Sequence, residues 1–544
     1  MNQSIVYSRW PIVKILSLCL LAAVLLIFSF PRFNFEILAW FGFVPLFFAL
    51  KNKPKGKAFL LAYLTGVIFW TGTIYWLAHV TFLGTILLVL YLAVYFGILG
   101  LIVSTIDYRL STIESLLFIP SLWVLLEYIR SHLLTGFPWV LLGYSQYLNL
   151  PIIQIADITG TWGVSFLVMM VNVAIKEMLG LRSQVLGLSQ KRNYKILFFV
   201  FCFLFFVFGY GVYRLYLQPA ACNPQPVRIS VIQGNIPQEL KWDIGSREFI
   251  VNKYIRLTAE AFKDNPDLII WPEAAMPCVL EEAPIFYEKV KEFAKRIKTP
   301  LVLGAVTSGN DMYYNSALFI SSEGRLLNRY DKLHLVPFGE YIPLKQILPF
   351  LETIVPIGDI TAGKEYTIFK IQNPKSKIQN KSQIPNPNGS TPLTMALKRS
   401  RSAKSQSTNN FAVLICFEDL FPELSRQFVR RGAQLLVNIT NDAWYKRSSA
   451  AEQHFQASVF RAIENQIYLV RSANTGISGF IEPCGKIISL VQDKLGRDIF
   501  IDGYATKELF LSKRNPSFYT RFGDVFILTC LLFVLYGIIH KFKI

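Results

Sequence analysis

Long apolar runs constrain this chain more than any other feature of its sequence. Residues 58–106 contain no Asp, Glu, Lys or Arg, and a helix that crosses a membrane needs about 20 mostly apolar residues. This segment therefore has room for two membrane helices joined by a turn. The same criterion predicts eight spans in all, at about residues 11–31, 34–50, 58–79, 83–106, 114–131, 158–179 and 195–217, with the last one within 521–544.

Composition and charge agree with a membrane protein. Hydrophobic residues make up 53% of the chain and charged residues 17%, whereas soluble domains average about 45–50% and about 25%. The net charge of +19 comes largely from Lys and Arg in alternate loops, which is typical of cytoplasmic loops. We therefore expect both termini in the cytoplasm and residues 218–520 on the opposite side. Because topology explains most of the basic excess and no nucleic-acid motif accompanies it, we expect no nucleic-acid partner.

The polar block between the seventh and eighth spans has the pattern of an α/β domain. Short β-rich runs alternate with helical patterns, and this alternation predicts a layered α/β fold. The expected strands are 227–233, 268–271, 301–306, 315–320, 411–415 and 434–439, and the expected helices are 247–262, 285–297, 422–432 and 451–466. Residues 371–410 break the pattern: they are rich in Asn, Ser, Pro and Lys and contain no Asp or Glu. We expect a flexible, solvated surface insertion there.

Three predicted strands end in residues that can perform chemistry. Glu273 follows the run LIIWP, Lys332 lies in RYDKLHL, and Cys416 follows VLI. Ligand sites of α/β sheets gather at the carboxyl ends of strands, so these side chains can share one crevice. A thiol needs a base to become a nucleophilic thiolate, and a lysine can stabilise the oxyanion that forms on an attacked carbonyl. Taken alone, each residue is more often a solvated charge or an inert buried thiol; only the combination indicates acyl transfer.

The motifs around these residues resemble a known family. WPEAAMP (271–277), YDKLHLVPFGEYIP (330–343) and CFEDLFP (416–422) resemble the Glu-Lys-Cys motifs of the nitrilase, or carbon–nitrogen hydrolase, superfamily. QGNIPQELKWD, NITNDAWY, EQHFQAS and NTGISG narrow the resemblance to the bacterial apolipoprotein N-acyltransferases. It covers nearly the whole chain apart from residues 371–410. The fold it implies is an α-β-β-α sandwich, the nitrilase-like domain, seated on an eight-helix membrane domain.

The resemblance implies a role for each matching residue. Glu273 corresponds to the general base, Lys332 to the oxyanion stabiliser and Cys416 to the nucleophile. The backbone N–H of Phe417 would complete the oxyanion site, although the family commonly has tyrosine at that position. The positions implied to support the triad or bind substrate are Glu340, Glu418, Trp242, Phe417, Tyr341 and Trp444.

The implied reaction is a two-step acyl transfer at the outer face of the bacterial inner membrane. A phospholipid, typically phosphatidylethanolamine, would acylate Cys416, and the thioester would pass its acyl chain to the α-amino group of a diacylated apolipoprotein. No metal-ligand spacing such as HExxH or CxxC is present, so we expect no metal and no cofactor, and we expect a monomer. One alternative is a membrane-tethered amidase acting on a small amide, and another is a transporter or scaffold with an inactive domain.

Several other residues have two interpretations. His454 can pair with Cys416 as in thiol proteases, but a packing role is favoured, and His334 is interpreted as structural. Asn441 and Asp442 either line the crevice with Trp444 or form a turn. Glu127 and Arg130 form an intramembrane pair or mark the membrane interface. A disulfide among Cys222, Cys278 and Cys484 is compatible with an oxidising compartment.

Overall fold

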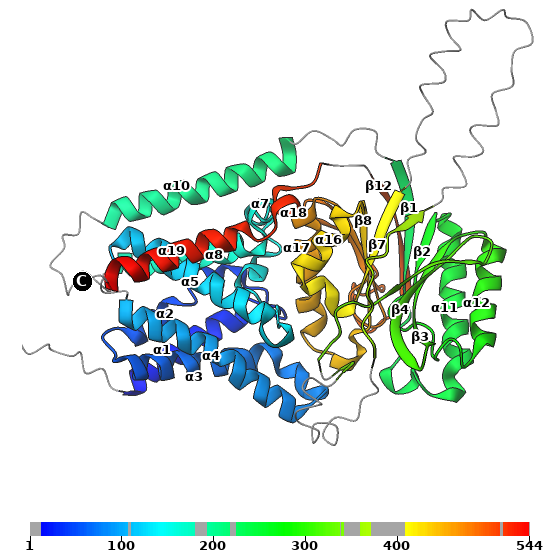
Figure 1. Ribbon diagram of the computed structural model, residues 1–544, viewed down its shortest axis with the longest axis horizontal. Helices are drawn as coiled ribbons and strands as arrows, with labels where there is room; N and C mark the ends of the chain where they lie inside the picture. Colours follow the sequence, from blue (N-terminus) through cyan, green and yellow to red (C-terminus); the bar gives the residue numbers. More distant parts are fainter. Residues whose placement is uncertain are drawn as a thin grey trace, which may run out of the picture.

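A computed structural model describes residues 12–106, 110–179, 193–217, 225–337, 339–341, 360–371, 409–511 and 515–542 of the chain. Figure 1 shows a bundle of helices on one side and layers of sheet and helix on the other. The predicted insertion lies almost wholly outside these described residues. Its two ends are the exception, and both belong to paired strands.

The helical half is built from the apolar runs. Its helices are α1 Ile12–Phe28, η1 Glu36–Trp40, α2 Val44–Leu50, α3 Lys55–Ile74, η2 Tyr75–His79, α4 Phe82–Ile106, α5 Thr112–His132, η4 Leu133–Thr135, η5 Leu142–Gln146, α6 Leu150–Ile153, α7 Ala156–Thr159, α8 Thr161–Met178, α10 Asn193–Val212 and η7 Tyr213–Leu217. After the second half of the molecule, α18 Phe518–Phe522 and α19 Val525–Phe542 return to the bundle, where α19 lies along α5 and α8 (Figure 1).

Small residues set the spacing of α3 and α4. A Cβ added at Gly100 of α4 would lie 2.6 Å from the carbonyl oxygen of Ala58 and 2.5 Å from the Cβ of Ala62. Only glycine therefore lets the two backbones come this close, as at many interfaces between membrane helices.

Five described helical segments are long and apolar enough to cross a membrane. They are Lys55–His79, Phe82–Ile106, Thr112–Thr135, Thr161–Met178 and Phe198–Tyr216. The predicted first, second and eighth spans correspond to the shorter apolar helices Ile12–Phe28, Glu36–Leu50 and Val525–Ile539. Several membrane-spanning helices are thus supported, whereas the predicted number of eight is not reached by the length and composition of the described residues.

The second half is a two-sheet sandwich. One sheet has the order β12-β1-β2-β3-β4-β5 and the other β11-β10-β9-β8-β7-β6. The strands are β1 Gln225–Gln233, β2 Leu268–Ile270, β3 Leu301–Gly309, β4 Met312–Ile320, β5 Leu326–Asp331, β6 Phe369–Ile371, β7 Asn409–Ile415, β8 Leu435–Thr440, β9 Tyr468–Ala473, β10 Gly479–Ile481, β11 Ile487–Leu490 and β12 Gly503–Leu511. The parallel pairs β1–β2–β3 and β7–β8–β9 form the centre of each sheet.

Helices cover the outer face of each sheet. Helices α11 Arg247–Ala261 and α12 Pro284–Ile297 lie on the far side, and α16 Pro422–Arg430 and α17 Ala450–Asn465 lie between the second sheet and the bundle (Figure 1). Short η turns complete this half: η8 Gln238–Leu240, η9 Ile244–Ser246, η10 Phe262–Asp264, η11 Cys416–Leu420 and η12 Asp442–Tyr445. The predicted α-β-β-α sandwich is confirmed, as are the expected strands and helices and the strand before Lys332, which is β5. The strands β6 and β9 to β12 were not predicted.

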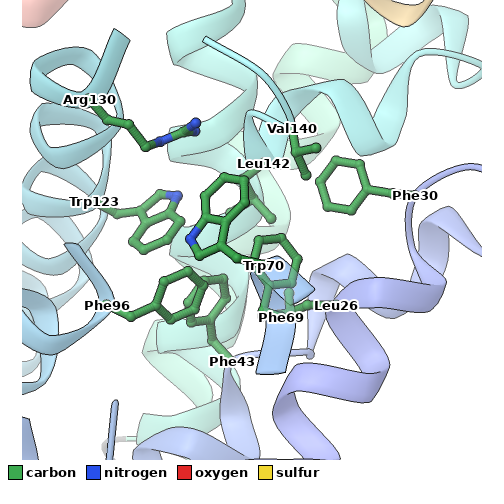
Figure 2. A pocket seen from close by; sticks show the side chains of 10 residues that line it. All are labelled: Leu26, Phe30, Phe43, Phe69, Trp70, Phe96, Trp123, Arg130, Val140 and Leu142. Carbon is green, nitrogen blue, oxygen red and sulfur yellow. The ribbon is translucent and has the colours of Figure 1, made fainter. Parts of the chain in front are cut away.

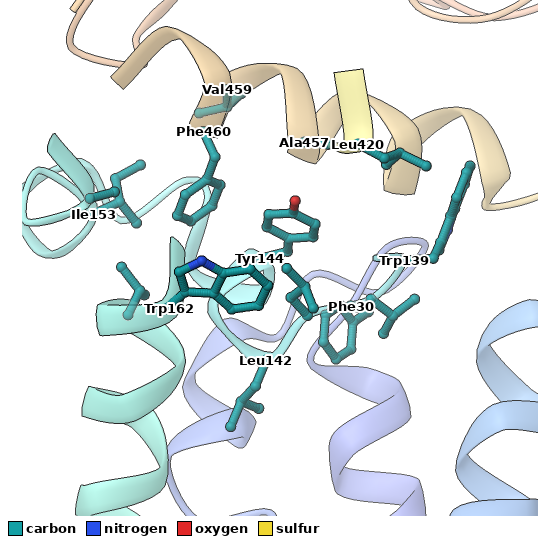
Figure 3. Packing of buried hydrophobic residues seen from close by; sticks show 14 of the residues in the cluster. Phe30, Trp139, Leu142, Tyr144, Ile153, Trp162, Leu420, Ala457, Val459 and Phe460 are labelled. Atoms are coloured by element: carbon teal, nitrogen blue, oxygen red, sulfur yellow. The ribbon is translucent and has the colours of Figure 1, made fainter. Parts of the chain in front are cut away.

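Helix α17 packs directly on the bundle. Figure 3 shows Phe460 of this helix pointing towards Tyr144 and Trp162 of the helical half. The rings of Tyr144 and Phe460 lie 5.1 Å apart, and the carboxylate of Glu464 accepts a hydrogen bond from the backbone N–H of Thr161. The layer that carries α17 is therefore joined to the bundle by both apolar and polar contacts.

The two charges expected in the fifth span bind backbone groups. The guanidinium of Arg130 donates to the carbonyl oxygens of Phe137 and Trp139 at 2.7 and 2.8 Å, and Glu127 accepts from the backbone N–H of Leu142 at 2.7 Å. Arg130 also lies over Trp70, beside a cavity of about 10 Å³ (Figure 2). The pair thus anchors segment 137–142, which runs beneath the sandwich.

Candidate active site

The ends of three strands bring the predicted residues together. Glu273 follows β2, Lys332 follows β5 and Cys416 follows β7. Lys332 Nζ lies 3.9 Å from Glu273 Oε1, and both side chains are close enough to Cys416 to influence its ionisation. All three are buried. The carboxylate, the ammonium and the thiol are therefore close together in the structure, as the sequence predicted.

A second carboxylate holds the lysine. Both oxygens of Glu340 lie within 2.9 Å of Lys332 Nζ, and the Asn315 amide nitrogen donates to both Glu340 and Glu273 at 2.8 and 2.7 Å. Burial by itself lowers the pKa of Lys332, but the charges of Glu340 and Glu273 outweigh it and raise that pKa. Lys332 is therefore a fixed cation with little freedom to give up its proton.

The backbone is strained next to Glu273 and at Cys416. Ala274, directly after Glu273, has φ +43°, and Cys416 has φ +54°. Such conformations are costly for residues other than glycine and gather at functional sites. Gly304 of β3 lies behind Glu273, where an added Cβ would come within 2.6 Å of the Glu273 Cα. The close approach of β3 thus helps to fix the position of the glutamate.

The surroundings of Cys416 favour its neutral thiol over the thiolate. Burial and the charge of Glu273 raise its pKa well above the usual range, while Lys332 acts in the opposite direction. Because a thiol is a far weaker nucleophile than a thiolate, a reaction at this cysteine would require a base. Glu273 lies where it can accept that proton.

Glu418 joins the two loops that carry Cys416 and Lys332. Its carboxylate accepts from the backbone N–H of Ile415, just before the nucleophile, and from those of Leu333 and His334, just after the lysine. The Tyr330 hydroxyl donates to it as well. Burial raises the pKa of Glu418 to about 7. The resemblance had placed Glu418 among the supporting residues, and the contacts give it a positioning function.

His454 fixes the backbone of the nucleophile. Its Nδ1 binds Asp442 at 3.0 Å, and its Nε2 binds Asp419 at 2.9 Å and the carbonyl oxygen of Cys416 at 3.2 Å. Burial and Arg471 lower the pKa of His454, but the two aspartates outweigh them and raise it. Both nitrogens are thus occupied by partners other than the thiol, in agreement with the packing role favoured from the sequence.

Lys241 is a site residue that sequence reasoning missed. Its Nζ donates to the backbone carbonyl of Glu273 at 3.1 Å, and the side chain is almost completely buried. Burial lowers its pKa to about 8, against the raising effect of Glu273 and Cys416. The motif QGNIPQELKWD contains this lysine next to Trp242, but only the fold brings it to Glu273.

The remaining predicted residues lie at the rim or in supporting positions. Trp242 and Trp444 are 44% and 50% exposed, so they are available to a ligand. Phe417 is buried and stacks on Trp139 with ring centroids 6.2 Å apart. Tyr341 is half-buried and pairs with Pro337 in a β-bridge.

Other sequence interpretations are resolved by packing. His334 lies against Phe421 with ring centroids 3.7 Å apart, and burial lowers its pKa to about 4, so it is a neutral structural residue. Asn441 binds Gln238, and Asp442 binds His454. Cys278 and Cys484 are free thiols, and Cys222 lies outside the described residues, so the disulfide suggested among these cysteines is not formed between the two described ones.

The two-sheet sandwich places this half of the chain in the carbon–nitrogen hydrolase class, and residues 228–501 match the family model described as "Carbon-nitrogen hydrolase". Residues 22–174 match a second model, "Apolipoprotein N-acyltransferase N-terminal domain". The chain belongs to the apolipoprotein N-acyltransferase family.

Relatives named apolipoprotein N-acyltransferase match most of the chain. A protein of Geobacter metallireducens is 37% identical, over 94% of this chain and 92% of its own length. One from Rickettsia prowazekii is 30% identical, over 76% of this chain and 74% of its own length. Among solved structures, an amidase from Nesterenkonia sp. is 15% identical, with a TM-score of 0.38, over 57% of this chain and 98% of that one.

Proposed function

We propose that this protein is an acyltransferase that moves an acyl chain from a phospholipid to the N-terminal cysteine of diacylated lipoproteins. Family membership along nearly the whole chain supports the activity. The observation that supports the mechanism is the convergence of Glu273, Lys332 and Cys416, next to Phe417, whose ring stacks on Trp139 of the helical bundle.

The first step forms a thioester. Glu273 takes the proton from the Cys416 thiol, and the thiolate attacks the carbonyl carbon of a phospholipid ester. Lys332 and the backbone N–H of Phe417 stabilise the resulting oxyanion, which is often the largest single catalytic effect. The C–O bond then breaks, and Glu273 returns the proton to the departing alkoxide. The products are an acylated Cys416 and a lysophospholipid.

The second step transfers the chain to nitrogen. The neutral α-amino group of the lipoprotein cysteine attacks the thioester carbonyl, and its proton passes to Glu273. The C–S bond breaks, the cysteine takes the proton back, and an amide is released. A membrane domain suits both substrates, because extracting an acyl chain from a bilayer costs about 0.8 kcal/mol per CH₂ group.

We further propose that the protein crosses the bacterial inner membrane eight times, with cytoplasmic termini and the sandwich on the opposite side. Phosphatidylethanolamine is the proposed donor, and the enzyme is proposed to act as a monomer. An amidase that hydrolyses a small amide is not favoured, because a membrane domain of the lipoprotein-modifying family precedes the hydrolase-like domain.

The deciding experiment supplies both substrates to the full-length protein. A synthetic diacylated lipopeptide is incubated with the protein and phospholipid vesicles, and the products are weighed by mass spectrometry. The lipopeptide should gain the mass of one acyl chain, and Cys416→Ala should abolish both this gain and the thioester on the protein. A thioester that persists in Cys416→Ala, or ammonia release from small amides without lipopeptide acylation, would overturn the proposal.

A further inference from the structure

The side-chain amide of Gln453 is the most densely bonded polar group between the sandwich and the helical bundle among the described residues. Its oxygen accepts from the indole N–H groups of Trp76 and Trp139 at 3.1 and 2.8 Å. Its nitrogen donates to the carbonyl oxygens of Pro31 and Thr73 at 3.3 and 3.0 Å, and also to the hydroxyl of Ser449, just before α17, at 3.2 Å. One residue of α17 thus binds three separate segments of the bundle.

The position of the Gln453 side chain requires a group that both donates and accepts hydrogen bonds, as an amide does. Two donors from the bundle meet the oxygen of Gln453, and two carbonyl acceptors meet its nitrogen, so a group that only donates or only accepts leaves partners unsatisfied. The side chain is 2% exposed, and a buried polar group without a partner costs about 1–3 kcal/mol. The amide is therefore suited to hold the two halves in one relative position.

This contact is directly connected to the catalytic centre. The next residue, His454, binds the carbonyl oxygen of Cys416. Trp139, held by Gln453, stacks on Phe417 with the ring planes 20° apart. The depth of Cys416 relative to the bundle is thus set where α17 meets the bundle.

We propose that Gln453 is a positioning residue that seats the catalytic centre over the bundle, so that the ester of a bilayer phospholipid reaches Cys416. The inference rests on the proposed function. A phospholipid is held at a fixed depth by its own bilayer and does not follow a displaced nucleophile, whereas a small ester in water does. Since a displacement of about 1 Å can cost about 100-fold in rate, the seating matters for the bilayer substrate in particular.

The test compares two acyl donors in full-length Gln453→Leu. Acylation of Cys416 is followed by mass spectrometry, once with phosphatidylethanolamine in reconstituted vesicles and once with the water-soluble ester p-nitrophenyl butyrate. The phospholipid reaction should slow by about 10-fold or more, and the soluble-ester reaction should stay within about threefold of the wild type.

Gln456→Leu is a matched control. Gln456 lies on the same helix and is equally buried, but its amide atoms have no hydrogen-bond partner among the described residues. The same substitution there should leave both reactions within about twofold of the wild type, because no hydrogen bond is lost. The proposal would be overturned if Gln456→Leu lost as much of the phospholipid reaction as Gln453→Leu while keeping the soluble-ester reaction.

Gln453→Glu covers the case in which the leucine variant does not fold. It keeps an acceptor for both indoles but loses the donors to Pro31 and Thr73, so the same selective loss is expected. The proposal would be overturned if the acylation rate fell equally with phosphatidylethanolamine and with p-nitrophenyl butyrate, or if it fell with neither. If the wild type reacts with the soluble ester but never with phospholipid, the proposed function itself fails.

Discussion

Lys332 Nζ lies 2.8 Å from Glu340 Oε2 but 3.9 Å from Glu273 Oε1. The cation of the site is therefore held mainly by the carboxylate that is not the proposed base. Glu273 is bound by the neutral amide of Asn315, and in the proposed mechanism it exchanges a proton with Cys416. In that mechanism Glu340 holds the lysine and Glu273 moves the proton, which is the division of roles tested next.

Glu340→Gln tests this division. The variant keeps an oxygen that can accept a hydrogen bond but removes the charge that holds Lys332, so the ammonium is expected to move towards Glu273 and neutralise the base. Thioester formation on Cys416 should fall by about 10- to 100-fold, measured as the single-turnover rate of acylation. Glu323→Gln, in the exposed turn between β4 and β5, is the control and should react normally. A normal rate in Glu340→Gln would contradict the division.

Lys241→Met tests the buried second lysine. The variant keeps the apolar stem but leaves the Glu273 carbonyl without this donor, so acylation should slow by about 10-fold. In the wild type, burial lowers the pKa of Lys241 to about 8, so the folded state binds the lysine proton more weakly than the unfolded state does. Below about pH 8 the lysine therefore destabilises the fold, and this cost shrinks as the pH rises from about 8 to about 10.5.

Activity and stability should consequently change in opposite directions. At neutral pH, Lys241→Met should have a thermal midpoint in detergent equal to or above that of the wild type, although it acylates more slowly. A lower midpoint together with a normal acylation rate would contradict both parts of this prediction.

The contacts of His454 predict that the folded protein becomes less stable as the pH rises. Its two aspartate partners raise its pKa in the folded state, so its stabilising effect is complete below the unfolded value of about 6.5 and disappears as the pH rises through the folded value. The thermal midpoint, measured from about pH 6 to about pH 9, should fall more steeply in the wild type than in His454→Gln. His79→Gln, at an exposed position, should keep the slope of the wild type. Equal slopes in the wild type and His454→Gln would refute the role of the imidazolium.

The strand pairing at the two ends of the 371–410 insertion predicts that the residues between them can be removed. Ile371 of β6 pairs with Asn409 of β7 in antiparallel register, so an Asn-Gly turn can join them as a hairpin. Replacing residues 372–408 by Asn-Gly should leave the acylation rate and the thermal midpoint close to those of the wild type. Extending the deletion through Phe411 would remove its stack on Phe369 and should lower the midpoint. A large loss from the shorter deletion would give the insertion a function of its own.

The sequence by itself determined the local and compositional features of this protein. Apolar length predicted the membrane helices, and alternating strand and helix patterns predicted the sandwich, because these signals lie within short windows of the chain. The motifs at 271–277, 330–343 and 416–422 indicated the family and the candidate triad for the same reason. The first, second and eighth predicted spans correspond to shorter apolar helices in the described residues, so their crossing of the membrane stays a prediction.

Only the tertiary structure showed which side chains bind one another. Lys241 meets Glu273, Asn315 bridges two carboxylates, and Gln453 binds a tryptophan that lies 377 positions away in the chain. His454 and Glu418 became positioning residues only when their partners were known. Hydrogen bonds depend on distance and direction in space rather than on spacing in sequence. The residues that hold the nucleophile in place were therefore visible only in the folded molecule.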